Sequence, residues 1–472
     1  MENRYAILLA GGVGSRLWPV SRDLYPKQLV RFVGDDSMVQ SVIKRVAPVI
    51  DSDNIRIVCG SEYCHEISTH ISDTGISPKG KVYLEPCGRN TAPAILLGVL
   101  NILAGEPDAI CCVFPADHVI KDAALFKKSL EDAIHLASLG HIVTFGVTPH
   151  YPETGYGYIE GGQEMEKGAL SIKRFVEKPS EEIAEQYLAA GNFFWNSGMF
   201  AFKASVFVDE MKKQSPEILS KMEAILSNGG KISKEAYRQI PDISVDCAIM
   251  EKTSRGVVLP SDFGWSDIGS WKSLYDFLPK DENQNVIDGD VIARETRGCL
   301  IMGDKRLIAA SHIENMAIIE TADSIFVSDL KNSRNVKAIV NDLKESGRKE
   351  CHNHMTIYHP WGKITLLDRQ DQTEISRITV NPGSVFPAEE KLGEEKTGEE
   401  TQGGQPPAGG KMASSIQISV IQGAATIQTD RWTKRVETGQ NALIGKDDRL
   451  LRMENSGETQ LSMVYVKTAI LS

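Results

Sequence analysis

Short apolar runs alternate with segments of helical spacing through the first 150 residues of the chain. Apolar runs at 6–10, 55–58, 109–114 and 141–146 are typical of buried strands, because each is short and continuous. Between them, 38–49, 91–103 and 126–139 show the spacing of helices, and 91–103 is apolar on every side. This alternation predicts an α/β fold with a mostly parallel sheet and helices on both faces. Ligands of such folds bind at the carboxyl ends of the strands.

The pattern changes near residue 285. Residues 286–327 form short β-like pieces broken by glycines and polar turns, and 329–344 then has the spacing of one closing helix. From 351 onward the chain is all-β, with strands predicted at 375–380, 415–420 and 461–466. The segment 387–411 is rich in Glu and Gly and predicts a disordered loop, because it cannot bury a core. We therefore expect three domains, at 1–280, 281–350 and 351–472.

Composition narrows the class of protein. A length of 472 residues fits two or three domains, with 41% hydrophobic and 24% charged residues as in ordinary globular proteins. The net charge of −11 argues against a nucleic-acid partner. The eight cysteines include no Cys-x-x-Cys pair, the first strand leaves no room for a signal peptide, and no apolar stretch is long enough to span a membrane. We expect a cytoplasmic protein with reduced thiols.

The most informative segment follows the first apolar run. It carries three glycines and then three cations: Gly11, Gly12, Gly14, Arg16, Arg22 and Lys27. Glycines let backbone N–H groups approach a phosphate, and fixed cations neutralise its charge. The loop is not a Walker loop, because Gly14 is not followed by Lys-Ser/Thr, and it lacks the third glycine of a dinucleotide fingerprint. It predicts a site for a nucleoside triphosphate.

Further motifs follow in a fixed order. They are Glu85-Pro-Cys-Gly-Arg-Asn-Thr-Ala-Pro93, Phe114-Pro-Ala-Asp-His118, Thr154-Gly-Tyr-Gly-Tyr158, Phe175-Val-Glu-Lys-Pro179, Phe194-Trp-Asn-Ser-Gly-Met199, Met250-Glu-Lys-Thr253 and Gly264-Trp-Ser-Asp-Ile-Gly269. With the glycine loop, they resemble mannose-1-phosphate guanylyltransferases over about residues 4–345. The resemblance implies a Rossmann-like domain of the glycosyltransferase A type, a short β-helix-like segment and a C-terminal cupin-like barrel. It also implies transfer of GMP from GTP to α-D-mannose 1-phosphate, with release of pyrophosphate.

The resemblance assigns roles to the charged residues of these motifs. Arg16 would neutralise the leaving pyrophosphate, and Lys27 would hold the phosphates at the reacting centre. Asp117 and Asp267 would hold Mg²⁺, which prefers carboxylate oxygens shared with substrate phosphates. Structural roles are the alternatives for both carboxylates, since Asp117 could cap the following helix and Asp267 could stabilise a turn before Gly269.

The remaining motifs resemble the family's base and sugar subsites. Gly11, Gly12 and Gly14 would bind the nucleotide, together with Arg89, Asn90 and Thr91 near the nucleobase. Thr91 could instead be only the N-cap of the helix at 91–103. The sugar residues implied by the resemblance are Gly157, Glu177, Lys178 and Asn196.

The C-terminal segment departs from the long bacterial form of the family, in which a cupin domain isomerises mannose 6-phosphate. Active cupin isomerases bind a metal through histidines, whereas residues 360–472 contain none, and Leu451 stands at an expected ligand position. We therefore expect a degenerate domain. A metal site at His352, His354 and His359 is conceivable, but nothing nearby supplies further ligands.

Two other functions stay open at this point. One is a bifunctional isomerase and guanylyltransferase, which the missing histidines disfavour. The other is a non-catalytic subunit that senses sugar nucleotides, which the set Arg16, Lys27, Asp117 and Asp267 disfavours. The β-rich segment after 285 resembles a family region used for dimer contacts, so we expect a homodimer.

Overall fold

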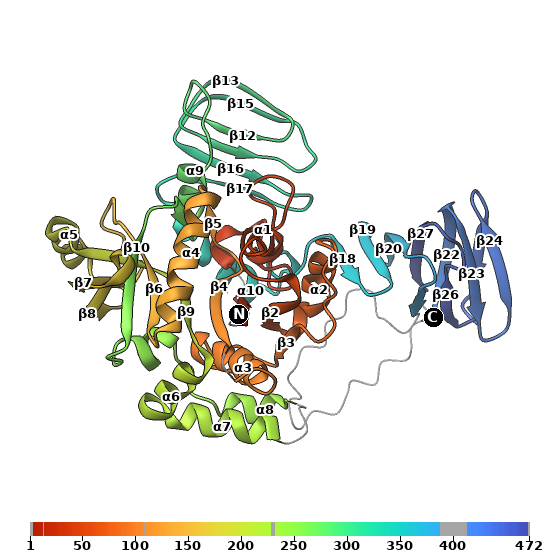
Figure 1. Ribbon diagram of the computed structural model, residues 1–472. Coiled ribbons are helices and arrows are strands. Elements are labelled where there is room, and N and C mark those ends of the chain that lie inside the picture. The colour runs from red at the N-terminus through yellow and green to blue at the C-terminus, as the bar shows by residue number, and fades with distance from the viewer. Residues whose placement is uncertain (1–2, 13, 108, 228–231, 388–412, 471–472) are drawn as a thin grey trace. The chain divides into compact units, whose positions relative to one another are not determined.

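The computed structural model describes residues 3–12, 14–107, 109–227, 232–387 and 413–470 (Figure 1). The chain divides into two compact units, residues 1–352 and 353–472. Of the loop predicted at 387–411, Pro387 ends strand β21, and residues 388–411 lie outside the described residues.

The first unit is built on a nine-stranded sheet with the order β3-β2-β1-β4-β9-β6-β10-β8-β7. Neighbours among β1 to β4 pair in parallel, as do β6 and β10, whereas β9 pairs antiparallel with both β4 and β6. The sheet is therefore mixed, because β9 follows the antiparallel strands β7 and β8 rather than a simple crossover. The strands are β1 (Arg4–Ala10), β2 (Ile55–Gly60), β3 (Val82–Glu85), β4 (Ile110–Pro115), β6 (Ile142–Val147), β7 (Tyr158–Glu164), β8 (Leu170–Val176), β9 (Phe193–Lys203) and β10 (Gly256–Ser261).

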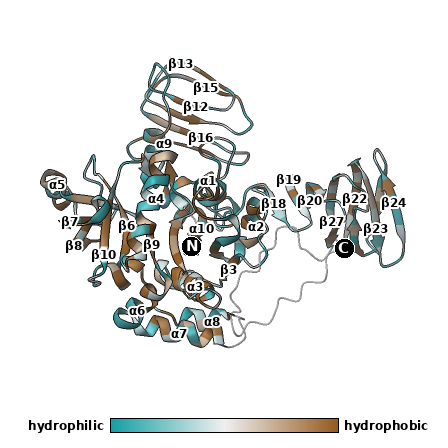
Figure 2. Ribbon diagram, viewed as in Figure 1, coloured by the Kyte–Doolittle hydropathy of each residue, from teal (hydrophilic) through white to brown (hydrophobic). Residues whose placement is uncertain are grey.

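Helices cover both faces of this sheet. Successive residues of β1 point to opposite faces, so Leu8 packs in one core cluster and Ile7 in the other. Figure 2, in which the ribbon is coloured by hydropathy, shows hydrophobic residues in brown along strands of the sheet and along α3. The first face carries α1 (Met38–Val46), α2 (Cys64–Ser72) and α4 (Ala123–Ser138), and the second carries α3 (Thr91–Leu103), α6 (Ala204–Gln214), α7 (Pro216–Ser227) and α8 (Lys234–Arg238). Two further helices are α5 (Glu181–Ala190) and α9 (Trp271–Phe277).

A short β-helix follows, as the sequence predicts. Strands β12 (Val286–Asp288), β14 (Leu300–Met302) and β16 (Met316–Glu320) stack in parallel, and β17 (Ile325–Asp329) closes that sheet antiparallel. Beside them β13 (Val291–Arg297) pairs with β15 (Ile308–Glu314), and elsewhere β5 (Val119–Ile120) pairs with β11 (Trp265–Ser266). The closing helix α10 covers Val336–Glu345, so the prediction of a helix from 329 placed its start too early, because β17 extends to Asp329.

The second unit consists of two antiparallel sheets around an apolar core. One sheet is β18 (Thr356–His359), β19 (Gly362–Gln370), β20 (Thr373–Val380), β27 (Leu461–Ile470), β22 (Ala413–Gln422) and β25 (Asn441–Ile444). The other is β21 (Val385–Pro387), β26 (Leu450–Glu454), β23 (Ala424–Thr429) and β24 (Thr433–Glu437). This cupin-like unit has Phe386, Ile427 and Met453 in its core.

The prediction that Leu451 stands at a ligand position inside this barrel is wrong. Leu451 is 40% exposed, whereas Leu450 and Met453 on either side of it in β26 are buried. The pairing of β26 with β23 shifts register at this point, which leaves Leu451 as the extra residue of a β-bulge. The bulge turns its side chain away from the core.

Candidate functional site

The glycine loop after β1 needs its glycines for backbone reasons. Gly12 and Gly14 have φ values of 85° and 69°, in the left-handed region that side chains disfavour. A Cβ on Gly14 would also lie 2.6 Å from Cβ of Lys27, so a larger residue there would displace that lysine. The amide of Gln28 donates a hydrogen bond to the carbonyl of Gly12 over 3.1 Å. The conformation of the glycine loop and the position of the segment at Lys27 therefore depend on each other.

Lys27 lies between the two aspartates that the sequence singles out. Its Nζ donates to Oδ2 of Asp117 over 2.9 Å and also to the backbone carbonyl of Asp267. The Lys27 side chain is 6% exposed and that of Asp117 is 31% exposed. Asp117 follows β4 at its carboxyl end, and Asp267 follows β11, so three segments distant in sequence converge on one ammonium group.

Both carboxylates are held from several sides. Burial raises the pKa of Asp117, but the charges of Lys27 and His118 outweigh that effect and leave this pKa below its ordinary value. Oδ1 of Asp267 accepts from the hydroxyl of Tyr156 over 2.7 Å and from the backbone N–H of Gly269 over 3.0 Å. The turn role considered for Asp267 therefore exists, but the capping role of Asp117 does not, because Asp122 caps α4.

The two aspartates fit a divalent cation that is shared with substrate. Lys27 uses only Oδ2 of Asp117, and Tyr156 and Gly269 use only Oδ1 of Asp267. A Cβ on Gly269 would lie 2.8 Å from Oδ2 of Asp267, so the glycine leaves space at that oxygen. No group of three or more His, Cys, Asp or Glu side chains able to hold a metal exists in the described part of the chain. Phosphate oxygens would have to complete the shell, as Mg²⁺ commonly requires.

A cavity of about 690 Å³ opens beside this cluster, between the nucleotide domain and helix α10 with the residues just before it. Of the predicted site residues, Arg16, Lys178 and Asp267 line it. Others come from the loop before β7 and from the start of α10, and together the lining is Arg16, Glu153, Thr154, Gly155, Tyr156, Lys178, Asp267, Gly269, Ser270, Ser273, Arg334, Asn335, Lys337, Ala338 and Asn341. The participation of α10 was not predicted from the sequence.

The residues predicted near the nucleobase begin α3. Asn90, with φ 65°, is the N-cap, since its side chain accepts from the backbone N–H of Thr91 over 2.9 Å. The alternative that Thr91 caps the helix is wrong, because Thr91 Oγ1 accepts from the N–H of Val245 instead. Arg89 donates to the carbonyl of Arg238, which follows the buried Tyr237 in α8.

Glu85 is a buried carboxyl that the sequence reasoning did not single out. One of its oxygens accepts from the hydroxyl of Tyr237 over 2.8 Å, and the other lies 3.9 Å from where a Cβ on Gly11 would be. Burial raises the pKa of Glu85 to about 7. Glu85 therefore lies next to Gly11 of the glycine loop, at the end of the edge strand β3.

The predicted sugar residues also come together. A Cβ on Gly157 would lie 2.7 Å from Oε2 of Glu177, and the ammonium of Lys178 pairs with Glu177. The backbone N–H of Asn196 donates to the carbonyl of Gly157 over 2.8 Å. Burial and the charge of Glu177 raise the pKa of Asp246 to about 6, so Asp246 belongs to the same group.

Asp246 holds Asn196 in position. Nδ2 of Asn196 donates to Oδ1 of Asp246 over 2.9 Å, and its Oδ1 accepts from Thr144 Oγ1 over 3.0 Å and from the N–H of Gly198 over 3.2 Å. Both acceptor positions of this amide are therefore occupied. The one local signal for Asp246 is its place at the start of a π-helical turn, which sequence patterns do not reveal.

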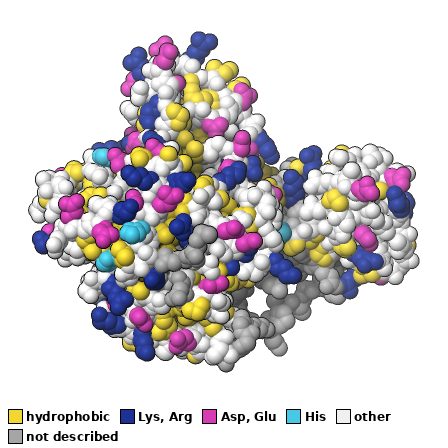
Figure 3. Space-filling view, viewed as in Figure 1, with side chains coloured by type: hydrophobic (Ala, Val, Ile, Leu, Met, Phe, Trp, Pro, Cys, Tyr) yellow, Lys and Arg dark blue, Asp and Glu magenta, His cyan; other side chains and the backbone are white. Residues whose placement is uncertain are grey.

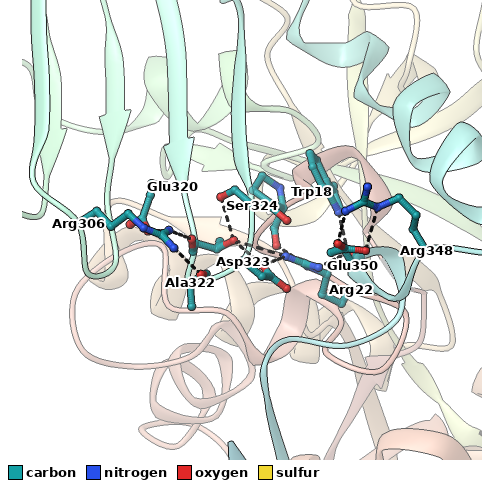
Figure 4. Close-up of polar contacts among 11 residues, drawn as sticks. Trp18, Arg22, Arg306, Glu320, Ala322, Asp323, Ser324, Arg348 and Glu350 are labelled. Carbon is teal, nitrogen blue, oxygen red and sulfur yellow. Dashed lines mark hydrogen bonds and ion pairs between the residues drawn. The ribbon is translucent and has the colours of Figure 1, made fainter. Parts of the chain in front are cut away.

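The segment between Arg16 and Lys27 is clamped by the β-helix and by the residues that follow α10 (Figure 4). Nη2 of Arg22 pairs with Oδ1 of Asp323 over 2.7 Å, and its Nε donates to the carbonyl of Pro19 over 2.6 Å. The carbonyl of Glu350 accepts from Arg22 and, over 2.8 Å, from the indole N–H of Trp18. The side chain of Arg22 is fully buried.

Histidines near residue 352 form no metal site among the residues that the structure describes. His352 pairs instead with Asp23 over 2.8 Å, and the ring of His359 stacks on Trp361 with the centroids 4.8 Å apart.

Basic and acidic side chains are interspersed over the face shown in Figure 3. Within the described residues, no helix is long and apolar enough to cross a membrane.

A glycine loop after β1, a buried lysine and a carboxylate at the end of β4 on a mixed α/β sheet are features expected of a nucleotidyl transferase. Residues 5–284 match the family model described as nucleotidyl transferase. Residues 289–343 match a mannose-phosphate isomerase/GMP-like β-helix domain, and 346–392 match the mannose-6-phosphate isomerase C-terminal family. The chain belongs to the mannose-1-phosphate guanylyltransferase family, as its relatives show.

A mannose-1-phosphate guanylyltransferase of Klebsiella pneumoniae is 40% identical over 389 residues, which cover 80% of this chain and 82% of that protein. The alginate biosynthesis protein AlgA of Pseudomonas aeruginosa is 38% identical over 389 residues, which cover 80% of each. A crystal structure described as mannose-1-phosphate geranyltransferase of Thermus thermophilus has a TM-score of 0.67 and 31% identity, and covers 72% of this chain and 99% of that one. Nucleotidyl transferases of this family generally use a divalent metal.

Proposed function

We propose that the protein transfers GMP from GTP to α-D-mannose 1-phosphate, giving GDP-mannose and pyrophosphate. Relatives about 40% identical carry this activity in their names, and others are named for alginate and xanthan biosynthesis. The product then supplies GDP-sugar and polysaccharide synthesis. The observation that carries the proposal is the placement of Lys27, whose ammonium group contacts Asp117 and the backbone of Asp267 beside a cavity lined by cations.

The reaction is an in-line displacement at phosphorus. An oxygen of the sugar phosphate forms a bond to the α-phosphorus of GTP, and the bond from that phosphorus to the bridging oxygen of the β-phosphate breaks. Pyrophosphate leaves with the electron pair. Such reactions depend mainly on positioning and on charge stabilisation. Lys27 holds the phosphates at the reacting centre, and Arg16 neutralises the charge that develops on pyrophosphate.

Asp117 and Asp267 together hold the divalent metal, for which we propose Mg²⁺. When bound, the metal polarises the reacting phosphate. Lys27 keeps Asp117 ionised and oriented by its hydrogen bond, and Tyr156 orients Asp267 in the same way. Mg²⁺ is favoured because the protein supplies two carboxylates and leaves the remaining positions to phosphate and water oxygens.

The two substrates bind on either side of this centre. Gly11, Gly12 and Gly14 receive the GTP phosphates, and Arg89, Asn90 and Thr91 lie at the nucleobase. Gly157, Glu177, Lys178 and Asn196 bind mannose 1-phosphate. The carboxylate of Glu177 accepts hydrogen bonds from sugar hydroxyls, and the ammonium group of Lys178 pairs with the phosphate.

A substrate matrix tests this function. Four nucleoside triphosphates are each combined with several sugar 1-phosphates, and the release of pyrophosphate is measured. We expect the highest turnover with GTP and mannose 1-phosphate. Lys27→Met should abolish it, whereas Lys44→Met, which removes an exposed lysine paired with Asp36, should leave it unchanged. Absence of turnover with every pair would refute an enzymatic role and favour a sensing subunit.

We further propose that the cupin-like unit is not an isomerase. The chain has no histidine after residue 359, and the core of this unit is filled by apolar side chains such as Met453 and Phe386. Conversion of fructose 6-phosphate to mannose 6-phosphate should therefore be absent, with or without added Zn²⁺ or Co²⁺. Measurable conversion would establish the bifunctional alternative.

The protein is proposed to act as a cytoplasmic homodimer. Strand β17 lies at the edge of its sheet and exposes Ile325 and Val327, with 59% and 56% of their surface accessible. Two such apolar side chains on one face favour contact with a second copy. Light scattering of the eluting protein should give a mass of twice the chain mass. For the Val327→Glu variant, it should give the mass of a single chain. Leu443→Glu, at an exposed position of the cupin-like unit, is the control.

A further inference from the structure

Helix α10 is built into the wall of the cavity. Its apolar face, with Val336 and Val340, packs in the same cluster as Leu17, the neighbour of Arg16. On the other side, Arg334, two residues before the start of the helix, forms two contacts with the buried Glu153, at 2.6 and 3.2 Å. The helix therefore spans from the turn that carries Arg16 to the loop that carries Tyr156.

The opposite face of α10 faces the cavity. Lys337, Ala338 and Asn341 are exposed and line it, one helical turn covering the three positions. The cavity lining contains four cationic side chains, Arg16, Lys178, Arg334 and Lys337, against two carboxylates, Glu153 and Asp267. The cavity thus has an excess of two positive charges and suits a polyanion.

Two of these four cations differ from the others. Arg334 is paired with Glu153 and Lys178 with Glu177, whereas Arg16 and Lys337 make no ion pair with any described residue. The turn of Arg16 packs directly against α10, so both unpaired cations lie on adjoining elements of one wall. Pyrophosphate carries more charge than one cation can neutralise, and a desolvated phosphate oxygen is best stabilised by charge-assisted hydrogen bonds.

We infer that Lys337 is a second pyrophosphate-binding residue, which acts with Arg16 on the β- and γ-phosphates of GTP. The inference rests on the proposed function and assigns part of the active site to the β-helix segment. It gives that segment a role in substrate binding in addition to assembly. Asn341, one turn further along the same face, also lines the cavity.

Steady-state kinetics in both directions test this inference. Lys337→Ala should raise KM for pyrophosphate in the reverse reaction, and KM for GTP in the forward reaction, about tenfold, the value of one charge-assisted hydrogen bond. KM for mannose 1-phosphate and for GDP-mannose should stay at the wild-type value, and Lys337→Arg should restore most of the affinity. Lys331→Ala, an exposed lysine outside the cavity, is the matched control.

The outcomes separate the two claims. A wild-type protein that releases no pyrophosphate contradicts the proposed function itself. An active wild-type protein whose Lys337→Ala variant keeps its KM for pyrophosphate overturns the inference alone. A rise confined to KM for mannose 1-phosphate also overturns it, because the lysine would then contact the sugar phosphate. Calorimetric titration of pyrophosphate into both proteins gives the same distinction without turnover.

Discussion

The buried pair of Arg22 and Asp323 offers a test of how the β-helix supports the nucleotide loop. The substitution Asp323→Ala removes one carboxylate and leaves the guanidinium group of Arg22 in place. That group is fully buried, whereas Asp323 keeps 15% of its side-chain surface exposed. Burial lowers the pKa of Arg22, and the charge of Asp323 counteracts this effect. Without Asp323, a buried charge therefore loses its compensating partner.

These contacts indicate how much free energy of unfolding the Asp323→Ala variant should lose. Removing one partner of a buried ion pair costs about 3–5 kcal/mol. Carbonyl groups of Pro19 and Glu350 still accept hydrogen bonds from Arg22, and Asp323 is partly exposed, so the low end applies. We expect Asp323→Ala to lower the free energy of unfolding by about 3 kcal/mol. The double variant Arg22→Met/Asp323→Leu should recover much of this loss, since apolar residues replace the whole pair.

Urea unfolding monitored by tryptophan fluorescence gives these free energies of unfolding. Trp18 and Trp271 report on the region of the Arg22–Asp323 pair, because both lie in the core cluster around it. The control is Asp276→Ala, which removes an exposed carboxylate paired with Lys272 on α9 and should cost less than about 0.5 kcal/mol. A loss for Asp323→Ala as small as the control would refute the reasoning. A second refuting result would be a double variant that loses more free energy of unfolding than Arg22→Met and Asp323→Leu lose together.

Three further predictions follow from the site. Gly14→Ala should reduce kcat at least about tenfold with little change in expression, since its Cβ would displace Lys27 from Asp117; kinetics against Gly34→Ala, a positive-φ glycine with free space around it, check this. Glu85→Gln should stabilise the protein more at about pH 8 than at pH 5, because the raised pKa of about 7 means that ionisation of the buried carboxyl removes stability as pH rises; melting curves at both pH values decide. Chelation of divalent metal should abolish turnover, and Mg²⁺ should restore it, whereas activity that survives chelation would exclude the role given to Asp117 and Asp267.

Local patterns of the sequence predict the elements well and their partners less well. The helix at 91–103 is found at its predicted bounds, because an apolar run follows clear start signals. Which of Asn90 and Thr91 caps it depends on a backbone φ of 65° at Asn90, which no pattern shows. The direction of β9 is equally hidden, since apolar strands of both orientations look alike.

The site was predicted as a set of motifs, and the structure adds the contacts between them. Lys27, Asp117 and Asp267 come from three distant segments, and the ammonium group of Lys27 contacts both aspartates. Residues outside the motifs could not be predicted in this way. Asp246 was missed because it acts through Asn196, and Lys337 because an exposed lysine on an amphipathic helix looks like an ordinary surface charge.

The most direct test of the central claim follows the phosphorus atoms themselves. Purified protein is mixed with GTP, mannose 1-phosphate and Mg²⁺, and the products are followed by phosphorus NMR. We predict equal amounts of GDP-mannose and pyrophosphate from the wild-type protein and neither from Lys27→Met. Unchanged substrates with the wild-type protein, or equal turnover by Lys27→Met, would contradict the account.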